Sequence, residues 1–300
     1  MISFIMMAYN VEDYIKEAIG ELKKESVIKW ELIVIDDHSK DETFSIVKNI
    51  AKKDDRITLV KNIEKGKVLG TNYGYSLTKG DIIKCIDSDD ILKQDFFKEY
   101  ENIKKYDVHC HDMLIVDNFL NKISVYSVNP FFFNSSYEDV LNNLTSLPKC
   151  CWSFKRKIAD KIFPMPENLP FEDVWMSIVI KKYAASYLNI EKPLYLYRQH
   201  ESNTFGGVLN YDFKKVKFRA NRLLKLVDII KYEQKYLIKG INKPFEKINI
   251  YLKFQSEGVS IFKILKSRLS RKYKYKLILI LYFPKFAALI TRLKWLFDKV

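Results

Sequence analysis

The sequence predicts an α/β fold in which a doubly wound, mostly parallel sheet is flanked by helices and followed by a C-terminal helical appendage. Short β-branched runs alternate with amphipathic helical stretches over the first 90 residues, which is typical of parallel strands with helices on both faces of their sheet. Several of the strand-like runs end in aspartates. From residue 206 onward the periodicity is helical, and glycine and proline interrupt it.

Hydrophobic periodicity places the first elements. We expect strands at residues 2–7, 31–35, 57–60 and 81–86, and helices at about 11–25, between the second and third strands, and at about 68–77. Ser39 and Glu42 have the spacing of a capping box and are expected to open the second of these helices. The sheet-facing side of that helix is expected to consist of Phe44, Ile46, Val47 and Ile50.

Three carboxylates follow the fourth predicted strand. Asp87, Asp89 and Asp90 lie within four positions, and they repel one another unless a cation is bound. Mg²⁺ and Mn²⁺ prefer such oxygen ligands, and an ion held by one or two carboxylates keeps positions free for the phosphates of a nucleotide. Alternatively, Asp89 and Asp90 cap a helix that starts near Ile91. A cap accounts for one aspartate, so the pattern favours a metal site in a nucleotide-using enzyme.

Other polar residues are expected at the same edge of the sheet. Tyr9 and Asn10 follow the first strand, and Asp36 and Asp37 end the second. Open sheets of this kind bind ligands beyond the carboxyl ends of their strands. We therefore expect these side chains to line one crevice with the aspartates at 87–90.

Length and composition predict one large domain with an appendage. The chain has 300 residues, of which 48% are hydrophobic. We expect a catalytic domain at 1–205, with a nucleotide-binding half at 1–95 and an acceptor-side half at 96–205, and a basic helical appendage at 206–300. The apolar start lacks a basic segment and is interpreted as a core strand. Four cysteines without zinc-ligand spacing also fit a cytoplasmic protein.

The basic charge is concentrated at the C-terminal end. Of the net charge of +14, residues 261–300 carry +10. Lysine and arginine alternate there with aromatic residues and leucine, which is typical of helices lying on an anionic membrane, and no run approaches the ~20 residues needed to cross a bilayer. We expect a peripheral location on the inner face of the cell membrane; a solvated helical face or a homo-oligomer contact is the alternative. No nucleic-acid-binding signature accompanies the charge.

Several common phosphate and nucleophile motifs are missing from the sequence. The nine glycines form neither a G-x-G-x-x-G fingerprint nor a G-x-x-x-x-G-K-[ST] loop, and no G-x-S-x-G elbow occurs. These absences disfavour dinucleotide-dependent dehydrogenases, P-loop NTPases and serine hydrolases.

An ordered set of short segments resembles the signature of family 2 glycosyltransferases, which have the GT-A fold. The segments are MAYN at 7–10, IDDHSKDET at 35–43, NYG at 72–74 with GD at 80–81, and DSDD at 87–90. The resemblance is close over about the first 95 residues and looser over 152–204. It implies an inverting transfer of a hexosyl unit in polysaccharide biosynthesis, with a divalent metal, Mn²⁺ or Mg²⁺. The donor is a nucleotide sugar, expected to be UDP-linked, and the acceptor is a hydroxyl of a saccharide or lipid-linked saccharide.

The resemblance also implies roles for single residues. Tyr9 and Asp37 would line the nucleoside pocket, with Asn10 and Glu12 beside them. Asp87 would approach the ribose, and Asp89, in the DXD motif, would ligate the metal. Three positions depart from the family pattern: Met7 replaces a proline, His38 a glycine and Thr71 a basic residue.

Acceptor-side residues are expected in the second half of the domain. Glu172 and Asp173 begin a predicted helix, where the family has a Glu-Asp pair whose aspartate is the catalytic base. An attacking hydroxyl needs a carboxylate to accept its proton, so Asp173 is the expected base and Glu172 the next candidate. Carboxylates in a first helical turn can also be simple caps. Asp90 is grouped with this acceptor-side set.

Two aromatic residues keep open interpretations. His200, in the segment YRQH at 197–200, is expected to ligate the metal or bind a phosphate, or else to be a surface histidine. Trp152 is expected either to stack on a sugar ring or to lie in the core.

Two other functions fit parts of the sequence. A nucleotidyltransferase also uses acids on a doubly wound sheet but normally has a glycine-rich basic loop near its N-terminus, which is absent here. A non-catalytic, membrane-peripheral saccharide-binding protein is disfavoured because Asp87, Asp89 and Asp173 are all present.

Overall fold

The computed structural model describes residues 1–200, 213–287 and 289–290, and the chain forms two compact units. The first unit consists of Met1–Asn134, Ser146–Asn168 and Glu172–Gln199. The second unit consists of Ser135–Thr145, Leu169–Phe171 and the described residues from His200 onward. The predicted boundary between positions 205 and 206 lies outside the described residues.

A nine-stranded sheet forms the centre of the first unit, in the order β3-β2-β1-β4-β8-β6-β9-β5, with β7 paired to β6. β3, β2, β1 and β4 are parallel, and so are β6 and β9, whereas β8, β5 and β7 run antiparallel to their neighbours. The strands are β1 Ile2–Ala8, β2 Trp30–Asp36, β3 Ile57–Lys61, β4 Ile82–Asp87, β5 Ile91–Leu92, β6 Val108–Val116, β7 Lys122–Tyr126, β8 Trp152–Lys155 and β9 Tyr187–Arg198. The predicted α/β fold with a mostly parallel core is confirmed.

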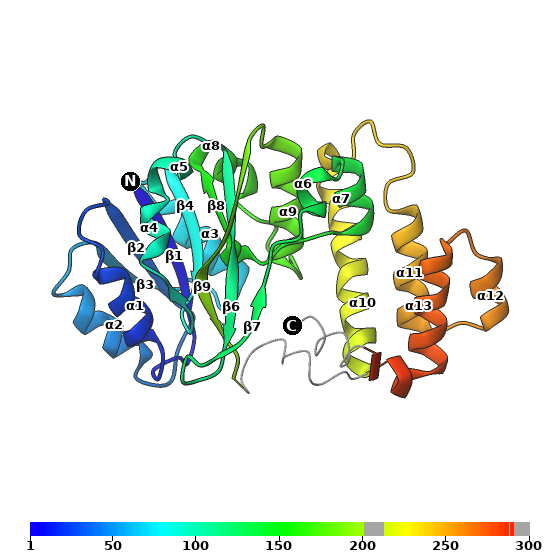
Figure 1. The fold of residues 1–300 in the computed structure, drawn as a ribbon, viewed down its shortest axis with the longest axis horizontal. Helices are drawn as coiled ribbons and strands as arrows, with labels where there is room; N and C mark the ends of the chain where they lie inside the picture. Colours follow the sequence, from blue (N-terminus) through cyan, green and yellow to red (C-terminus); the bar gives the residue numbers. More distant parts are fainter. Residues whose placement is uncertain (201–212, 288, 291–300) are drawn as a thin grey trace. The chain divides into compact units, whose positions relative to one another are not determined.

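Three crossover helices join the parallel strands: α1 Ile15–Lys23, α2 Thr43–Ala51 and α3 Lys67–Ser76. Right-handed crossovers place α1 and α2 on one face of the sheet and α3 on the other, as Figure 1 shows. A Cβ atom on Gly74 would collide with the side chain of Ile35, so α3 can pack closely on the sheet only with glycine there.

Shorter elements complete the first unit. The helices are α4 Asp95–Lys98, α5 Tyr100–Ile103, α6 Phe131–Asn134, α8 Arg156–Ile162 and α9 Glu172–Tyr183, and Lys149–Cys151 forms a 3₁₀ turn, η1.

Two predictions about helix starts are wrong. The helix predicted to open with a capping box begins at Thr43, with no side-chain cap from Glu42, because Ser39 Oγ instead accepts a bond from Asn10 N. No helix starts near Ile91, which lies in β5. The alternative interpretation of Asp89 and Asp90 as helix caps is therefore wrong.

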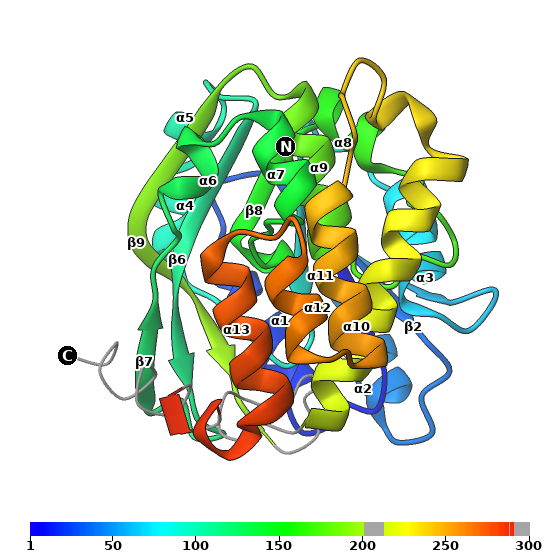
Figure 2. The same ribbon diagram turned by 90° about the vertical axis from the view of Figure 1, so that its right-hand side faces the viewer.

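The second unit is helical in the part that the structure describes. Its elements are α7 Tyr137–Asn143, α10 Phe213–Asp228, a π-helical turn Ile229–Glu233, a 3₁₀ turn Lys235–Leu237, α11 Glu246–Glu257, α12 Ile261–Lys266 and α13 Arg271–Tyr282. Figure 2 shows α10, α11 and α13 side by side. Gly258 has a φ of +76° and ends α11. Among the described helices, none is long and apolar enough to span a bilayer.

Candidate active site

Strand register brings the polar strand ends together. Met7 in β1 pairs with Asp87 in β4, and Ala8 pairs with Asp36 in β2. Asp37 N donates to Ala8 O at 2.8 Å, so the chain after β2 stays beside the end of β1. The strand ends that were predicted to meet at one edge of the sheet therefore lie together.

Asp37 supports the loop before α3. Its Oδ1 accepts hydrogen bonds from Asn62 Nδ2 at 2.7 Å and from Gly66 N at 2.9 Å. The Tyr9 side chain is 44% exposed, and Lys65 Nζ lies 4.6 Å from the centre of its ring. An exposed ring beside a rigid carboxylate is a surface on which a nucleoside can stack and bond.

Asn10 and Glu12 hold the loops after β1 and β2 together. Asn10 Oδ1 accepts a hydrogen bond from Lys40 N at 2.9 Å. Glu12 Oε2 accepts one from Glu42 N at 2.7 Å, so Glu12 supplies the carboxylate at the start of α2. The structure thus gives both residues a loop-bracing role, and their nucleotide-binding role stays a prediction.

Three of the predicted site carboxylates meet at Lys149. Its Nζ lies 3.1 Å from Asp87 Oδ1 and 3.5 Å from Glu172 Oε2. Its backbone N–H donates to Asp173 Oδ1 at 2.9 Å. Lys67 Nζ lies 3.7 Å from Asp87 Oδ1 on the more exposed side. The end of β4 and the start of α9, far apart in the sequence, therefore form one cluster.

The electrostatics of this cluster separate its carboxylates. Burial alone would raise the pKa of Asp87, but the ammonium groups of Lys149 and Lys67 outweigh it and hold that pKa below its usual range. Burial raises the pKa of Asp173 to about 6, with Lys149 opposing the rise and Glu172 adding to it. A pKa near the working pH suits a carboxylate that accepts a proton during a reaction.

The aspartates after β4 fit a divalent ion held by few protein ligands. Burial, together with the charges of Asp89 and Asp87, raises the pKa of Asp90 well above its usual range. Asp90 Oδ2 is buried and has no hydrogen-bond partner among the described residues. A cation would relieve both features. In the described parts of the chain no three histidine, cysteine, aspartate or glutamate side chains form a metal cage, so phosphate oxygens would have to complete the coordination.

Arg198, at the end of β9, holds this loop in place. Its backbone N donates to Asp90 Oδ1 at 2.8 Å, and its Nε donates to Asp89 O at 2.8 Å. Its Nη2 lies 2.6 Å from Glu17 Oε2 in α1. His200 follows two residues later and belongs to the second unit, and its role at a metal or phosphate stays a prediction.

Of the two interpretations of Trp152, the structure supports the core position and contradicts stacking on a sugar. Trp152 is 0% exposed, and its ring packs edge to face on Phe132 at 5.3 Å. Because β8 lies between β4 and β6, a tryptophan at its start is enclosed by the core, and a sugar cannot reach the ring face.

Lys149 and Arg198 were not predicted as site residues. Lys149 stands in the otherwise apolar run of residues 147–152, interrupted only by this one charge. A lone charge in an apolar run is costly unless it is paired, and this was the available signal. Arg198 lies in the segment assigned to His200, and nothing in the sequence reveals its partners.

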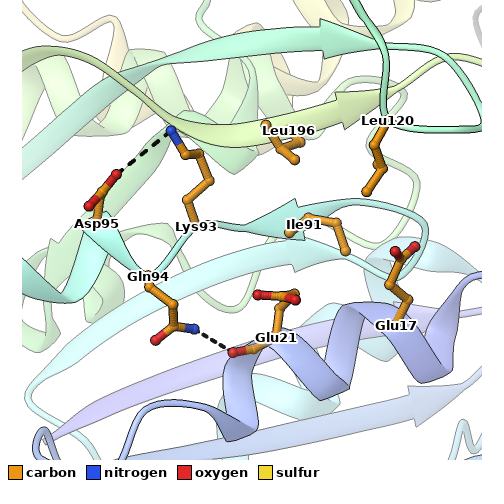
Figure 3. A pocket seen from close by; sticks show the side chains of 8 residues that line it. All are labelled: Glu17, Glu21, Ile91, Lys93, Gln94, Asp95, Leu120 and Leu196. Carbon is orange, nitrogen blue, oxygen red and sulfur yellow. Dashed lines mark hydrogen bonds and ion pairs between the residues drawn. The ribbon is translucent and has the colours of Figure 1, made fainter.

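A separate cavity of about 340 Å³ lies beside α1 and β5 in the first unit. Figure 3 shows that Lys93 faces Asp95 there and that Gln94 bonds to the Glu21 carbonyl. Glu17, the partner of Arg198, also lines it. None of the predicted site residues does, so this cavity is distinct from the carboxylate cluster.

Comparisons with known proteins agree with the fold and the motifs. The family model described as glycosyl transferase family 2 matches residues 3–163. The chain is 29% identical over 248 residues to the minor teichoic acid biosynthesis protein GgaB of Bacillus subtilis (strain 168), an alignment that covers 78% of this chain and 27% of GgaB. The chain spans less than half the length of the first curated relatives it matches.

Two solved structures are similar in fold. S. aureus TarS 1–349 in complex with UDP-GlcNAc has a TM-score of 0.57 at 18% identity, with 93% of this chain and 81% of that chain covered. The mannosyltransferase PcManGT from Pyrobaculum calidifontis, in complex with GDP-Man and Mn²⁺, has a TM-score of 0.52 at 16% identity, with 100% and 88% covered. The matched residues 3–163 are more than half of the chain, and the solved structures agree with its fold: the chain belongs to glycosyl transferase family 2.

Proposed function

We propose that this protein transfers a sugar from a nucleotide sugar to a hydroxyl of a saccharide acceptor, with inversion at the anomeric carbon. The observation that carries the proposal is the junction at Lys149, which joins Asp87 at the end of β4 to Asp173 at the start of α9. Asp87 lies on the side of the strand ends, where the nucleotide binds in sheets of this kind. Asp173 is a half-buried carboxylate whose pKa is raised by its burial.

The reaction needs one base and one leaving group. As the acceptor oxygen bonds to the anomeric carbon, its proton passes to the Asp173 carboxylate. The bond between that carbon and the diphosphate oxygen breaks at the same time, and the nucleoside diphosphate leaves with the electron pair. Glu172, which pairs with Lys149, is the next candidate for the base.

The metal proposed here is Mn²⁺ or Mg²⁺, bound through Asp89. Bound metal would neutralise charge on the departing diphosphate. Arg198 fixes the backbone of Asp89 and so aims its carboxylate. His200 is proposed as a further ligand or phosphate partner. The PcManGT complex named above contains Mn²⁺, which supports testing Mn²⁺ first.

The donor is proposed to be UDP-linked. The TarS complex holds UDP-GlcNAc, and the PcManGT complex holds GDP-Man, so proteins with this fold accept more than one base. For this chain, Tyr9 and Asp37 are the residues proposed to contact the nucleoside, and Asp87 the ribose.

The acceptor is proposed to be membrane-borne or lipid-linked, with the protein peripheral on the inner face of the cell membrane. In the second unit, Phe262 and Leu265 of α12 are 77% and 53% exposed. Next to them lies a groove of about 440 Å³ between α11 and α12, lined by Ile250, Phe254, Ser267, Glu246 and several basic residues. Those basic residues are Lys253, Lys263, Lys266 and Arg268. Apolar side chains among cations suit an anionic bilayer, and the relative GgaB is named for minor teichoic acid biosynthesis.

A donor screen tests this function. Purified protein is incubated with UDP, GDP and dTDP sugars and Mn²⁺ or Mg²⁺, and release of the nucleoside diphosphate is measured with and without saccharide acceptors. We expect turnover with one base class, inhibition by EDTA, and a loss of about 10²- to 10³-fold in Asp89→Ala.

The matched control for this screen is Asp55→Ala, which removes an exposed aspartate far from β4 in the sequence and should keep full activity. Full turnover of Asp89→Ala, or in excess EDTA, would contradict the metal assignment. Absence of binding and turnover with every donor would contradict the function.

A further inference from the structure

Lys149 is a buried cation in the middle of the carboxylate cluster. Its side chain is 7% exposed, and its only ion-pair partners within the described residues are Asp87 and Glu172. Burial alone would lower the pKa of this ammonium group, but the two carboxylates raise it well above its usual range. Lys149 is therefore charged, and that charge lies between the strand-end side and the helix α9 side of the site.

A second buried lysine holds the turn that carries Lys149. Lys84 in β4 is 0% exposed, and its Nζ donates to the carbonyl oxygens of Cys150 and Trp152. The same Nζ lies 2.9 Å from His111 Nε2. Because β4 and β8 pair only at Ile82 and Ile83, these bonds replace the missing strand pairing and fix η1 beside the end of β4.

The backbone of the same turn fixes the proposed base. The N–H of Lys149 donates to Asp173 Oδ1 at 2.9 Å, which leaves Oδ2 as the oxygen that can take a proton from an acceptor. The charged groups that act on Asp173 are Lys149, Glu172 and Lys67. The phenol of half-buried Tyr126 also interacts electrostatically with Asp173. Of the two cations, Lys149 lowers the pKa of Asp173 more than Lys67 does.

We propose that Lys149 is a positioning residue for sugar transfer: its ammonium group holds Asp87 and its backbone N–H holds Asp173, so that one residue keeps the donor side and the base in fixed relation. This inference rests on the proposed function. Lys149 acts through the two aspartates, and the transferred proton stays with Asp173.

The test compares Lys149→Met, which keeps the length and removes the charge, with Lys149→Arg, which keeps the charge. The measured quantities are kcat at saturating donor from about pH 5 to 9 and donor affinity by calorimetry. Without the cation the pKa of Asp173 rises. In Lys149→Met the midpoint of the acid limb should therefore move up by about one pH unit. The kcat of this variant at pH 6 should then be about 10-fold lower than its own kcat at pH 8.5.

Lys149→Arg should keep the wild-type midpoint. Lys157→Met is the matched control, since Lys157 pairs with buried Asp107 elsewhere in the first unit, and its pH profile should match wild type. A Lys149→Met protein that folds and retains the wild-type kcat and midpoint overturns the inference. A wild-type protein without any turnover overturns the proposed function instead.

A stability measurement covers the case in which Lys149→Met folds poorly. Free energies of unfolding in urea are compared for Lys149→Met, Asp87→Asn, which removes the charged partner of Lys149, and the double variant. If the carboxylates depend on the charge of Lys149, the free energy of unfolding of the double variant should fall by less than the sum of the two single-variant decreases. Additive losses mean that the residues are uncoupled, and they overturn the inference independently of activity.

Discussion

Asp173 shows how a single residue balances stability against reactivity. Its folded pKa of about 6 lies above the value of about 3.9 for an unfolded aspartate, so folding favours its protonated form. The stability that this group contributes is largest below about pH 4 and is lost as the pH rises through 6. At neutral pH the protein therefore holds a carboxylate that burial disfavours, which is typical of a functional group.

We expect Asp173→Asn to separate these two effects. Because an amide cannot accept the proton, kcat should fall by about 10²-fold or more while donor affinity changes little. Because the buried charge is removed, the free energy of unfolding at pH 7.5 should not decrease. Wild-type kcat should rise with pH through about 6, and this acid limb should disappear in the variant.

These expectations are checked by three measurements. Donor and acceptor titrations give kcat, calorimetry gives donor affinity, and urea unfolding gives the free energy of unfolding. Asp55→Asn, at an exposed aspartate, is the matched control. If Asp173→Asn keeps wild-type kcat, the base lies elsewhere and Glu172 is the next candidate.

At this scale the sequence predicts residues whose role follows from where a strand or helix ends. Asp87 and Asp89 could be predicted because a buried strand leads directly to them. Lys149 could not, because its role depends on η1 lying beside β4, a contact between residues 66 positions apart that Lys84 makes. The location of Trp152 could not be predicted either, because its ring is enclosed only through the position of β8 within the sheet.

At the level of elements, β1, β2 and β4 were predicted because each is an almost continuous apolar run, buried on both faces. Helix starts were predicted less well. The capping box failed because the loops after β1 and β2 bond to each other, so Glu12 takes the capping position from outside the helix. Within the helical periodicity predicted from residue 206 onward, α10 is followed by π and 3₁₀ turns, and residues 206–212 lie outside the described residues.

The end of β9 should control how well the loop after β4 binds metal. Arg198 bonds to Asp89 O, to Asp90 Oδ1, to Asn118 O and to Glu17. A lysine cannot reproduce this fork of donors. In Arg198→Lys we expect about a tenfold higher Mn²⁺ concentration for half-maximal activity, which corresponds to about 1.4 kcal/mol, and a loss of about 1–3 kcal/mol in the free energy of unfolding.

Mn²⁺ titration of activity and urea unfolding measure the two effects in the same preparations. Arg56→Lys is the matched control, because Arg56 bonds to Asp54 and to Glu25 O away from the site. It should lose stability without a change in the Mn²⁺ requirement. An unchanged requirement in folded Arg198→Lys would show that this residue only supports the fold.

At the scale of the whole molecule, the proposed site residues and the excess positive charge lie in different parts of the chain. The proposed catalytic residues other than His200 lie in the first unit, whereas residues 261–300 carry +10 of the total +14. The predicted membrane contacts by Trp295, Leu296 and Phe297 lie outside the described residues. The described part of the second unit still offers exposed apolar side chains next to cations, and α12 carries Phe262, Lys263, Leu265 and Lys266.

The last prediction concerns membrane binding by α12. Truncation at residue 266 would remove α13, whose Leu277 and Ile280 are buried, so point variants are preferable. Wild-type protein should sediment with anionic liposomes at low salt and be partly released at high salt, because each cation near the surface contributes up to ~1 kcal/mol that salt screens. Phe262→Ser with Leu265→Ser should reduce the fraction that remains bound at high salt, since that fraction depends on apolar burial.

Phe119→Ser, at an 85% exposed site in the first unit, is the matched control and should bind like wild type, and all three proteins should hydrolyse the sugar nucleotide equally. Equal sedimentation of the α12 variant and wild type, or none by either, would argue that this basic apolar surface contacts another protein chain, and the reason for proposing a membrane-borne acceptor would be removed.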